Sequence, residues 1–199
     1  MKFYAVIDTN VFVSALITKN PQSSTFKILE LFRSGIILPM YNSEILEEYA
    51  EVLSRAKFRI DEPMIVGLLS AVKAKGLNCE RKPANCSIPD PEDIVFYEIT
   101  LSREDAYLIT GNLKHFPHNG RVVSPADMLQ IIALAEDKRG LLCESEGPHY
   151  YATDLEDMVS IGFSYIDKIR AQSAQNGVSE MTLEEINEEI RLVRASRHH

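Results

Sequence analysis

Short, unbroken apolar runs alternate along the chain with stretches in which apolar residues recur at helical spacing. The apolar runs occupy residues 3–7, 36–38, 107–110 and 121–123, with a shorter one at 77–79. Such runs are typical of strands buried on both faces of a parallel sheet. Helical spacing is present at 26–34, 45–53, 62–75, 94–101 and from 125 onward. Because strands alternate with helices, we expect an α/β fold, a three-layer α/β/α sandwich with a central parallel sheet of four to five strands.

Two stretches between these elements carry turn-forming residues. Residues 14–23 are polar and contain Asn20-Pro21, which predicts a loop after the first strand. Pro39 is expected to close the second strand.

The pattern changes after the last predicted strand and its helix. We expect a sheet domain at 1–138, a charged linker at 139–153 and a helical extension at 154–197, in which Asn176-Gly177 separates two helices. Thr182-Leu183-Glu184-Glu185 is a capping box that starts the second of these helices. That helix has a narrow apolar stripe with arginines at 191, 194 and 197 beside it, so we expect it to pack against another surface.

Composition narrows the class of protein. The net charge is −8 and 45% of residues are hydrophobic, as in ordinary soluble proteins. No apolar run approaches the ~20 residues of a membrane span, and the N-terminus lacks the features of a signal peptide. Three cysteines without a C-x-x-C pair favour a reducing cytoplasm. Because the chain has no overall basic character, a nucleic-acid role would rest on local patches and metal ions.

The first predicted strand ends directly at a carboxylate. Asp8 follows the apolar run, and Asn10 lies two residues later. In open parallel sheets the ligand crevice lies outside the carboxyl ends of the strands, which makes Asp8 a candidate for chemistry. The alternative is that Asp8 only caps the helix that follows.

Four glutamates compete on the helix after the second strand. At about 100° per residue, Glu48 lies nearest the apolar stripe, whereas Glu44, Glu47 and Glu51 lie farther round toward solvent. Glu48 is therefore the best candidate to reach the crevice, although a solvated helix face could also explain it.

Further polar residues occur at the same predicted edge. Asp90 and Asp93 flank the start of a helix that is apolar on nearly every side, and Thr110-Gly111-Asn112 ends the third strand. Helix capping explains the two aspartates equally well, and turn formation explains Asn112. Carboxylates that converge repel one another unless a cation neutralises them, and oxygen ligands select Mg²⁺ or Mn²⁺. Such a site suits phosphoryl transfer.

Four motifs together resemble the PIN-domain nucleases. They are Asp8-Thr9-Asn10, the segment 43–49, Asp90-Pro91-Glu92-Asp93 and the segment 110–117, in that order and at similar spacing. The resemblance is strongest to toxin components of prokaryotic type II toxin–antitoxin systems, which are VapC-like in function. It implies an endoribonuclease dependent on Mg²⁺ or Mn²⁺, with Asp8, Glu48 and Asp93 as catalytic and metal-binding acids. Asn10, Asp90, Thr110 and Asn112 would support them.

The resemblance also implies partners. These are an RNA substrate, and an antitoxin protein or the chain's own C-terminal segment; we also expect a homodimer and no membrane association. Many family members carry an acid at the position of Asn112, so the amide weakens the case for a second metal ion.

Basic residues offer candidate substrate contacts. Lys114 and His115 follow the third strand, and Arg55, Lys57 and Arg59 form a small cluster. They could bind phosphates or be ordinary solvated charges. We further hypothesise that residues 150–197 resemble an antitoxin in cis and place Arg191, Arg194 or Arg197 near the carboxylates. The alternative is a helical hairpin that only packs on the domain or mediates a dimer.

Two other functions are weighed beside the nuclease. A haloacid-dehalogenase-type phosphatase also begins with Asp after its first strand, but it requires a second Asp where Asn10 stands. A catalytically silent or self-inhibited module that binds RNA or a partner is the alternative from a different class.

Overall fold

A five-stranded parallel sheet forms the centre of the protein. The computed structural model describes residues 1–140 and 153–197. The strands, in the order β3-β2-β1-β4-β5, are β1 (Phe3–Ile7), β2 (Ile37–Tyr41), β3 (Leu77–Asn78), β4 (Ala106–Ile109) and β5 (Val122–Val123). Every neighbouring pair is parallel. Ile7 of β1 pairs with Ile109 of β4, so Asp8 and Thr110 leave the sheet side by side.

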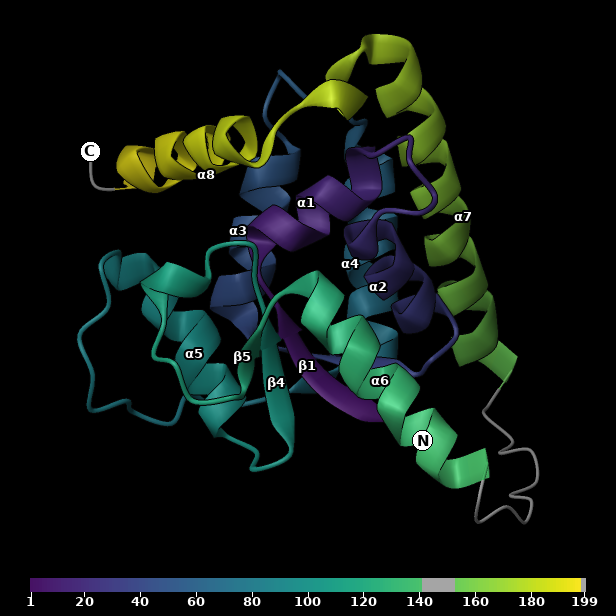
Figure 1. The fold of residues 1–199 in the computed structure, drawn as a ribbon. Helices are drawn as coiled ribbons and strands as arrows, with labels where there is room; N and C mark the ends of the chain where they lie inside the picture. The colour runs from purple at the N-terminus through teal and green to yellow at the C-terminus, as the bar shows by residue number, and fades with distance from the viewer. Residues whose placement is uncertain (141–152, 198–199) are drawn as a thin grey trace.

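Helices cover the sheet, as the α/β/α prediction requires. They are α1 (Thr9–Ile17), α2 (Ser24–Arg33), α3 (Ser43–Leu53), α4 (Glu62–Lys75), α5 (Ile94–Leu101) and α6 (Pro125–Gly140), with the 3₁₀ turns η1 (Pro91–Asp93) and η2 (Leu113–His115). Helix α2 contacts α1 and α6, whereas α5 contacts α3 and the central strands β1 and β4. Figure 1 shows α1, α2 and α6 in front of the sheet. The fold class expected from the sequence is confirmed.

Two local predictions are wrong. The expected loop at 14–23 begins too early, because α1 continues to Ile17. This helix is buried on nearly all sides and therefore has no polar face to mark its periodicity. Pro39 does not close β2, which continues to Tyr41; the short β3 joins β2 only at Met40 and Tyr41, beyond the proline.

Two long helices follow the sheet region, as predicted. They are α7 (Thr153–Asn176) and α8 (Leu183–Arg197), joined through the turn η3 (Val178–Glu180). The predicted linker falls largely on residues 141–152, which lie outside the described residues. Helix α7 packs closely on α4: a Cβ atom on Gly162 would lie 2.5 Å from the Ala71 Cβ. Helix α8 crosses above α3 and α5, at the end of the molecule where β1 gives way to α1 (Figure 1).

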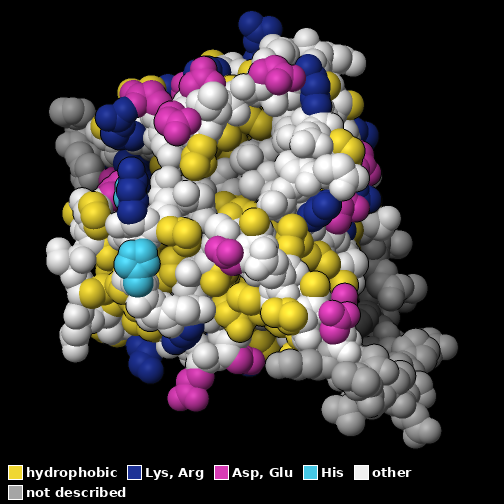
Figure 2. Space-filling view, in the orientation of Figure 1, with side chains coloured by type: hydrophobic (Ala, Val, Ile, Leu, Met, Phe, Trp, Pro, Cys, Tyr) yellow, Lys and Arg dark blue, Asp and Glu magenta, His cyan; other side chains and the backbone are white. Residues whose placement is uncertain are grey.

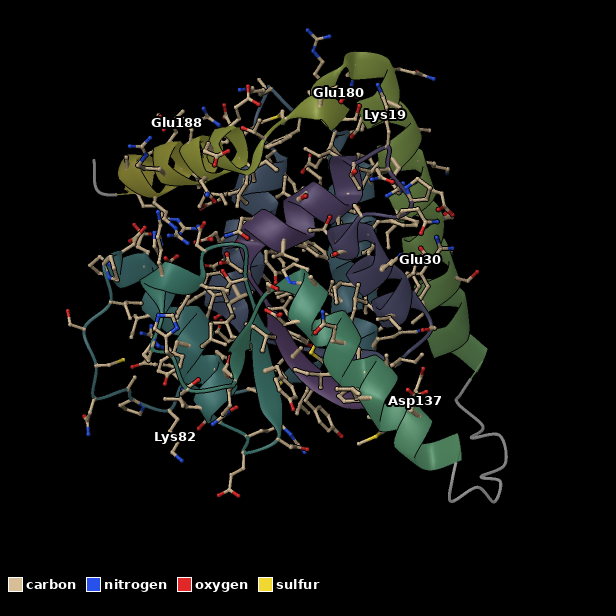
Figure 3. All side chains as sticks on the ribbon, in the orientation of Figure 1. Lys19, Glu30, Lys82, Asp137, Glu180 and Glu188 are labelled. Atoms are coloured by element: carbon tan, nitrogen blue, oxygen red, sulfur yellow. The ribbon has the colours of Figure 1, made fainter. Side chains whose placement is uncertain are left out.

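Charged side chains lie on the surface of this arrangement, and one exposed ion pair joins two distant segments. Lys19, just after α1, lies 3.4 Å from Glu180 at the end of η3 (Figure 3). The face shown in Figure 2 carries acidic and basic side chains interspersed. None of the helices, as far as the structure describes them, is long and apolar enough to cross a membrane.

Candidate active site

Asp8 is both a helix cap and a buried acid. It precedes α1 as the N-cap, and its Oδ1 atom accepts a hydrogen bond from the backbone N–H of Asn10 at 3.4 Å. Its Oδ2 atom also accepts hydrogen bonds from Asn10 Nδ2 at 2.9 Å and from Thr110 Oγ1 at 2.6 Å. The residue is 2% exposed. Capping alone does not explain a contact with the end of β4, so Asp8 also belongs to a polar cluster at the sheet edge.

Helix α3 directs Glu48 into the same cluster. Asn42 caps this helix through Ile45, and the apolar stripe then turns Glu48 inward. Glu48 is 2% exposed, whereas the other three glutamates of the helix are exposed, as the helical geometry predicts. Glu48 Oε1 accepts a hydrogen bond from Thr9 Oγ1 at 2.6 Å. Thr9 was not singled out from the sequence, although its position directly after Asp8 could have indicated it.

Asp90 and Asp93 come from the entry to α5. Asp90 caps η1 through Glu92, as the alternative interpretation expected. Asp93 is 5% exposed, and its Oδ2 lies 3.0 Å from Nδ1 of His115. At the end of β4, the backbone N–H of Asn112 donates to Thr110 Oγ1 at 2.9 Å. These predicted residues therefore lie at one edge of the sheet with Asp8.

Arg194 of α8 inserts its guanidinium among these acids. Its Nε and Nη2 atoms donate to the two oxygens of Glu48 at 3.0 and 2.9 Å. Its Nη1 atom donates to Asp90 at 2.7 Å and to Asp93 at 2.8 Å. The Arg194 side chain is 7% exposed. Of the three arginines proposed from the sequence, Arg194 is the one that is buried among the carboxylates.

The two neighbouring arginines lie farther out. Arg197 pairs with Glu51 and Glu92 and comes within 3.9 Å of Glu48, with 31% of its side chain exposed. Arg191 pairs with Glu188 on the same helix, and its side chain is 74% exposed.

Burial and repulsion determine the electrostatics of the acids. Burial, together with the charge of Asp93 and then Glu48, raises the pKa of Asp8 to about 7, even though the Thr110 hydrogen bond and Arg194 act in the opposite direction. Burial would lower the pKa of Arg194, but hydrogen bonds and charge attraction from Glu48 and Asp93 raise it above its ordinary value. Burial also raises the pKa of the Tyr49 hydroxyl, which donates to the Ile7 carbonyl. The site thus gathers several acids around one buried arginine, and the repulsion among the acids is only partly offset.

The predicted substrate contacts divide into two groups. Lys114 is exposed and, with His115, lines a cleft of about 350 Å³ that also reaches Asp8, Asp93 and Arg194. Arg55 and Lys57 lie beyond the end of α3, where both pair with Glu189 of α8. Arg59 is exposed and has a left-handed backbone, with φ of 52°.

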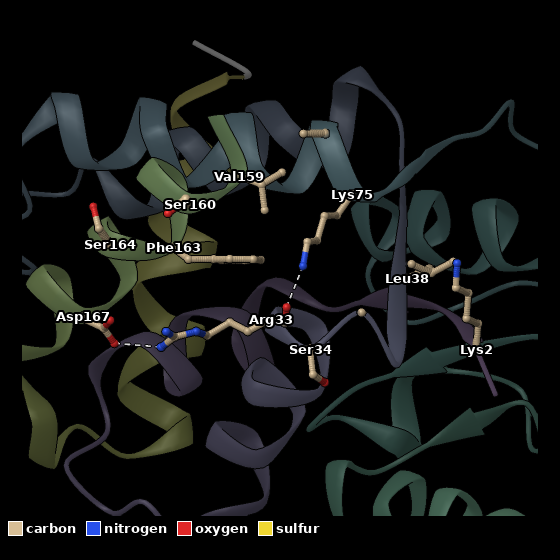
Figure 4. Close-up of a pocket in the computed structure, with 12 residues that line it drawn as sticks. Lys2, Arg33, Ser34, Leu38, Lys75, Val159, Ser160, Phe163, Ser164 and Asp167 are labelled. Carbon is tan, nitrogen blue, oxygen red and sulfur yellow. Dashed lines mark hydrogen bonds and ion pairs between the residues drawn. The ribbon is translucent and has the colours of Figure 1, made fainter. Parts of the chain in front are cut away.

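A larger cavity of about 720 Å³ lies elsewhere, between α4, α7 and the turn after α2 (Figure 4). It reaches Lys2 and Gly35, near the starts of β1 and β2, and therefore lies at the opposite edge of the sheet from Asp8. Two basic side chains that line it already bind partners within the protein: Arg33 pairs with Asp167 at 2.8 Å, and Lys75 donates a hydrogen bond to the Arg33 carbonyl at 2.6 Å. The smaller cleft, which contains the acids, is therefore the candidate site.

The chemistry of the donors fits a hard divalent cation. Three acids from two segments, Glu48 of α3 and Asp90 and Asp93 at η1, direct carboxylate oxygens at one cationic group, and such oxygens are the ligands that Mg²⁺ and Mn²⁺ prefer. With Arg194 in place, however, no group of three or more His, Cys, Asp or Glu side chains among the described residues is arranged to hold a metal ion. The acids are thus held by Arg194 in an arrangement that a metal ion would have to change.

The fold and the site together define this protein as an α/β protein with a cluster of buried carboxylates at the carboxyl edge of its parallel sheet. Residues 4–114, more than half of the chain, match the PIN domain family. The chain belongs to that family, whose members are generally metal-dependent nucleases. No curated protein sequence and no solved structure is significantly similar to this chain.

Proposed function

We propose that this protein is an endoribonuclease that depends on Mg²⁺ or Mn²⁺ and hydrolyses RNA phosphodiester bonds. The observation that carries the proposal is the convergence of Glu48, Asp90 and Asp93 on one cation beside buried Asp8. Membership of the PIN domain family supports nuclease chemistry at this edge. It also argues against the phosphatase of the haloacid-dehalogenase type.

Asp8, Glu48 and Asp93 are the residues that would hold the cation. A bound divalent ion would supply charge stabilisation at the phosphate and lower the pKa of a water molecule. The chain prepares the acids for this role: Asn10 and Thr110 fix the Asp8 carboxylate with hydrogen bonds of 2.9 and 2.6 Å. Asp90 lies at the mouth of the cluster as a supporting acid.

Two basic residues at the cleft are suited to the substrate. Lys114 is exposed there, and His115 lies 3.0 Å from Asp93. Lys114 can donate hydrogen bonds to phosphate oxygens of RNA, and His115 can do so through Nε2 when both of its ring nitrogens carry a proton. Such phosphate contacts do not depend on the base sequence. The RNA would therefore be positioned through its backbone at this cleft.

The biological role that we propose is that of a toxin in a toxin–antitoxin system, acting in the cytoplasm. The support is the resemblance of the four motifs to such toxins and a terminal helix that covers the acids. The thiols of Cys79 and Cys86 are free, in keeping with a reducing compartment. An antitoxin partner and a homodimer remain predictions.

A second candidate is a catalytically silent or self-inhibited module that binds RNA or a partner. The specific observation in its favour is the insertion of Arg194, which pairs with the acids without a metal ion. Metal binding without RNA cleavage would favour this candidate.

The test combines Mn²⁺ calorimetry with cleavage of labelled RNA by the full chain. Mn²⁺ is raised until binding saturates, so that Arg194 is displaced. Asp8→Asn and Glu48→Gln should each weaken Mn²⁺ binding and abolish cleavage, whereas exposed Glu47→Gln on the same helix should do neither. Equal activity of the Glu48→Gln and Glu47→Gln variants would contradict the assignment.

A further inference from the structure

Arg194 and a divalent cation cannot share the acids. The guanidinium already uses both oxygens of Glu48 and one oxygen each of Asp90 and Asp93. A buried charge is tolerated only when it is paired, and here four of the five guanidinium N–H groups donate to carboxylate oxygens. A metal ion that takes Glu48 and Asp93 as ligands must displace Arg194.

Helix α8 makes a second, opposite contact close by. The Glu189 carboxylate, with 8% of its side chain exposed, lies 2.9 Å from Arg55 Nε and 3.6 Å from Lys57 Nζ. Glu189 and Arg194 are five residues apart, or about 7.5 Å along the helix axis. An oxyanion held by one Arg and one Lys is also how proteins hold a nucleic-acid phosphate. One helix thus presents a cation to the acids and an anion to the neighbouring cations.

The remaining polar contacts of α8 fix its register over the site. The amide of Asn187 exchanges two hydrogen bonds with the amide of Asn112, at 3.3 and 3.2 Å. A Cβ atom on Gly111 would lie 3.1 Å from the Leu183 side chain, so α8 also packs closely on the turn that follows β4. Helix α7, by contrast, packs on α4, so the displacement of α8 leaves the main contact of α7 in place.

We propose that α8 is an inhibitory helix in cis that imitates the charges of the bound substrate. Arg194 stands in for the divalent cation, and Glu189 stands in for an RNA backbone phosphate on Arg55 and Lys57. The inference rests on the proposed function, because it assigns the same acids to a metal ion and adds a phosphate position. When RNA and metal replace α8, a cation replaces a cation and an anion replaces an anion, so neither the buried acids nor the half-exposed Arg55 and Lys57 are left without an opposite charge.

The first measurement is Mn²⁺ affinity, by calorimetry on the full chain. Arg194→Gln should bind Mn²⁺ at least about tenfold more tightly than wild type, because the competing cation is gone. Arg191→Gln is the matched control: it removes an arginine from the same helix, but one whose side chain is 74% exposed and paired with Glu188 of that helix. Arg194→Lys keeps the positive charge but lacks the several N–H donors of the planar guanidinium. Its Mn²⁺ affinity should therefore lie between those of Arg194→Gln and wild type.

The second measurement is RNA affinity, by fluorescence anisotropy with a fluorescein-labelled, 2′-O-methyl single-stranded RNA of mixed sequence. Glu189→Gln should bind this probe more tightly than Glu188→Gln, which removes the same charge from a half-exposed position of α8 that is paired with Arg191 and not with Arg55 or Lys57. Adding Arg55→Gln to the Glu189→Gln variant should remove the gain.

The outcomes separate the inference from the proposed function. Equal Mn²⁺ affinities of folded Arg194→Gln, Arg191→Gln and wild type overturn the inhibitory role, and equal RNA affinities of the two glutamate variants overturn the phosphate position. Neither result affects the nuclease proposal if wild type cleaves RNA. Tighter Mn²⁺ binding by Arg194→Gln without cleavage supports the inference and overturns the nuclease. If Arg194→Gln does not fold, Glu189→Gln carries the test, because loosening α8 should also raise Mn²⁺ affinity.

Discussion

Replacing Asp8 by Asn should change the stability of the metal-free protein in a direction that depends on pH. Burial and the nearby acids raise the pKa of Asp8 from 3.8 to about 7 in the folded state. Between these values the folded state binds more protons than the unfolded state, so this carboxyl group favours folding at low pH. Its contribution is lost as the pH rises through about 7, by ~1.4 kcal/mol per pH unit. The Asn variant has no such titration.

The size of the effect follows from the shift and the hydrogen bonds. A pKa difference of about 3 units corresponds to ~4 kcal/mol of destabilisation by the ionised carboxylate above pH 8. In the variant, an amide oxygen in the place of Oδ2 can still accept the hydrogen bonds from the Asn10 side chain and from Thr110. The amide nitrogen then takes the place of Oδ1 and faces the backbone N–H of Asn10, so one hydrogen bond is lost at a cost of ~1 kcal/mol. We therefore expect Asp8→Asn to be ~3 kcal/mol more stable than wild type at pH 8.5 and ~1 kcal/mol less stable at pH 4.

Urea unfolding followed by circular dichroism, in EDTA and across this pH range, measures the difference directly. Comparing the two proteins at each pH removes the contributions of the titrating groups that do not interact with Asp8. A stability difference that stays constant with pH would refute the reasoning, as would an Asn variant that is less stable at pH 8.5.

Two further predictions concern the helical extension. Gly162→Ala should lower the free energy of unfolding by ~1 kcal/mol, because the new methyl group would lie 2.5 Å from the Ala71 Cβ and overpacking outweighs the gain in helix propensity. Exposed Ser164→Ala on the same helix is the control, and equal unfolding midpoints would contradict the packing. Asn112→Asp should weaken the docking of α8. A carboxylate oxygen would replace the Asn112 Nδ2 donor and would then face the Asn187 Oδ1 atom, so one of the two hydrogen bonds becomes a repulsion. Faster limited proteolysis between α7 and α8 than in wild type checks this, and unchanged cleavage would count against it.

The sequence could predict the fold because local pattern and global topology agree. Four strands, a short fifth strand and the helices over 43–53 and 62–75 follow from periodicity and turn residues. The failure at α1 has a physical reason: its residues Val11, Phe12, Val13, Leu16 and Ile17 are all buried, so nothing alternates with a polar face.

The candidate site was only partly accessible to the same reasoning. The helical angle singled out Glu48 because α3 is amphipathic, and its burial agrees. The choice among Arg191, Arg194 and Arg197 depends on how α8 docks, which no local pattern encodes. Likewise, the Glu189 contact with Arg55 joins residues 134 positions apart and could be found only in the folded structure.

The most direct test of the account is RNA cleavage by Arg194→Gln in Mn²⁺, measured beside wild type and the double variant Arg194→Gln/Asp8→Asn. The account predicts faster cleavage by Arg194→Gln than by wild type and no cleavage by the double variant, because Arg194 blocks the acids and Asp8 is one of them. A folded Arg194→Gln variant that binds Mn²⁺ and leaves RNA intact would contradict the nuclease assignment, and equal cleavage by the single and double variants would contradict the site.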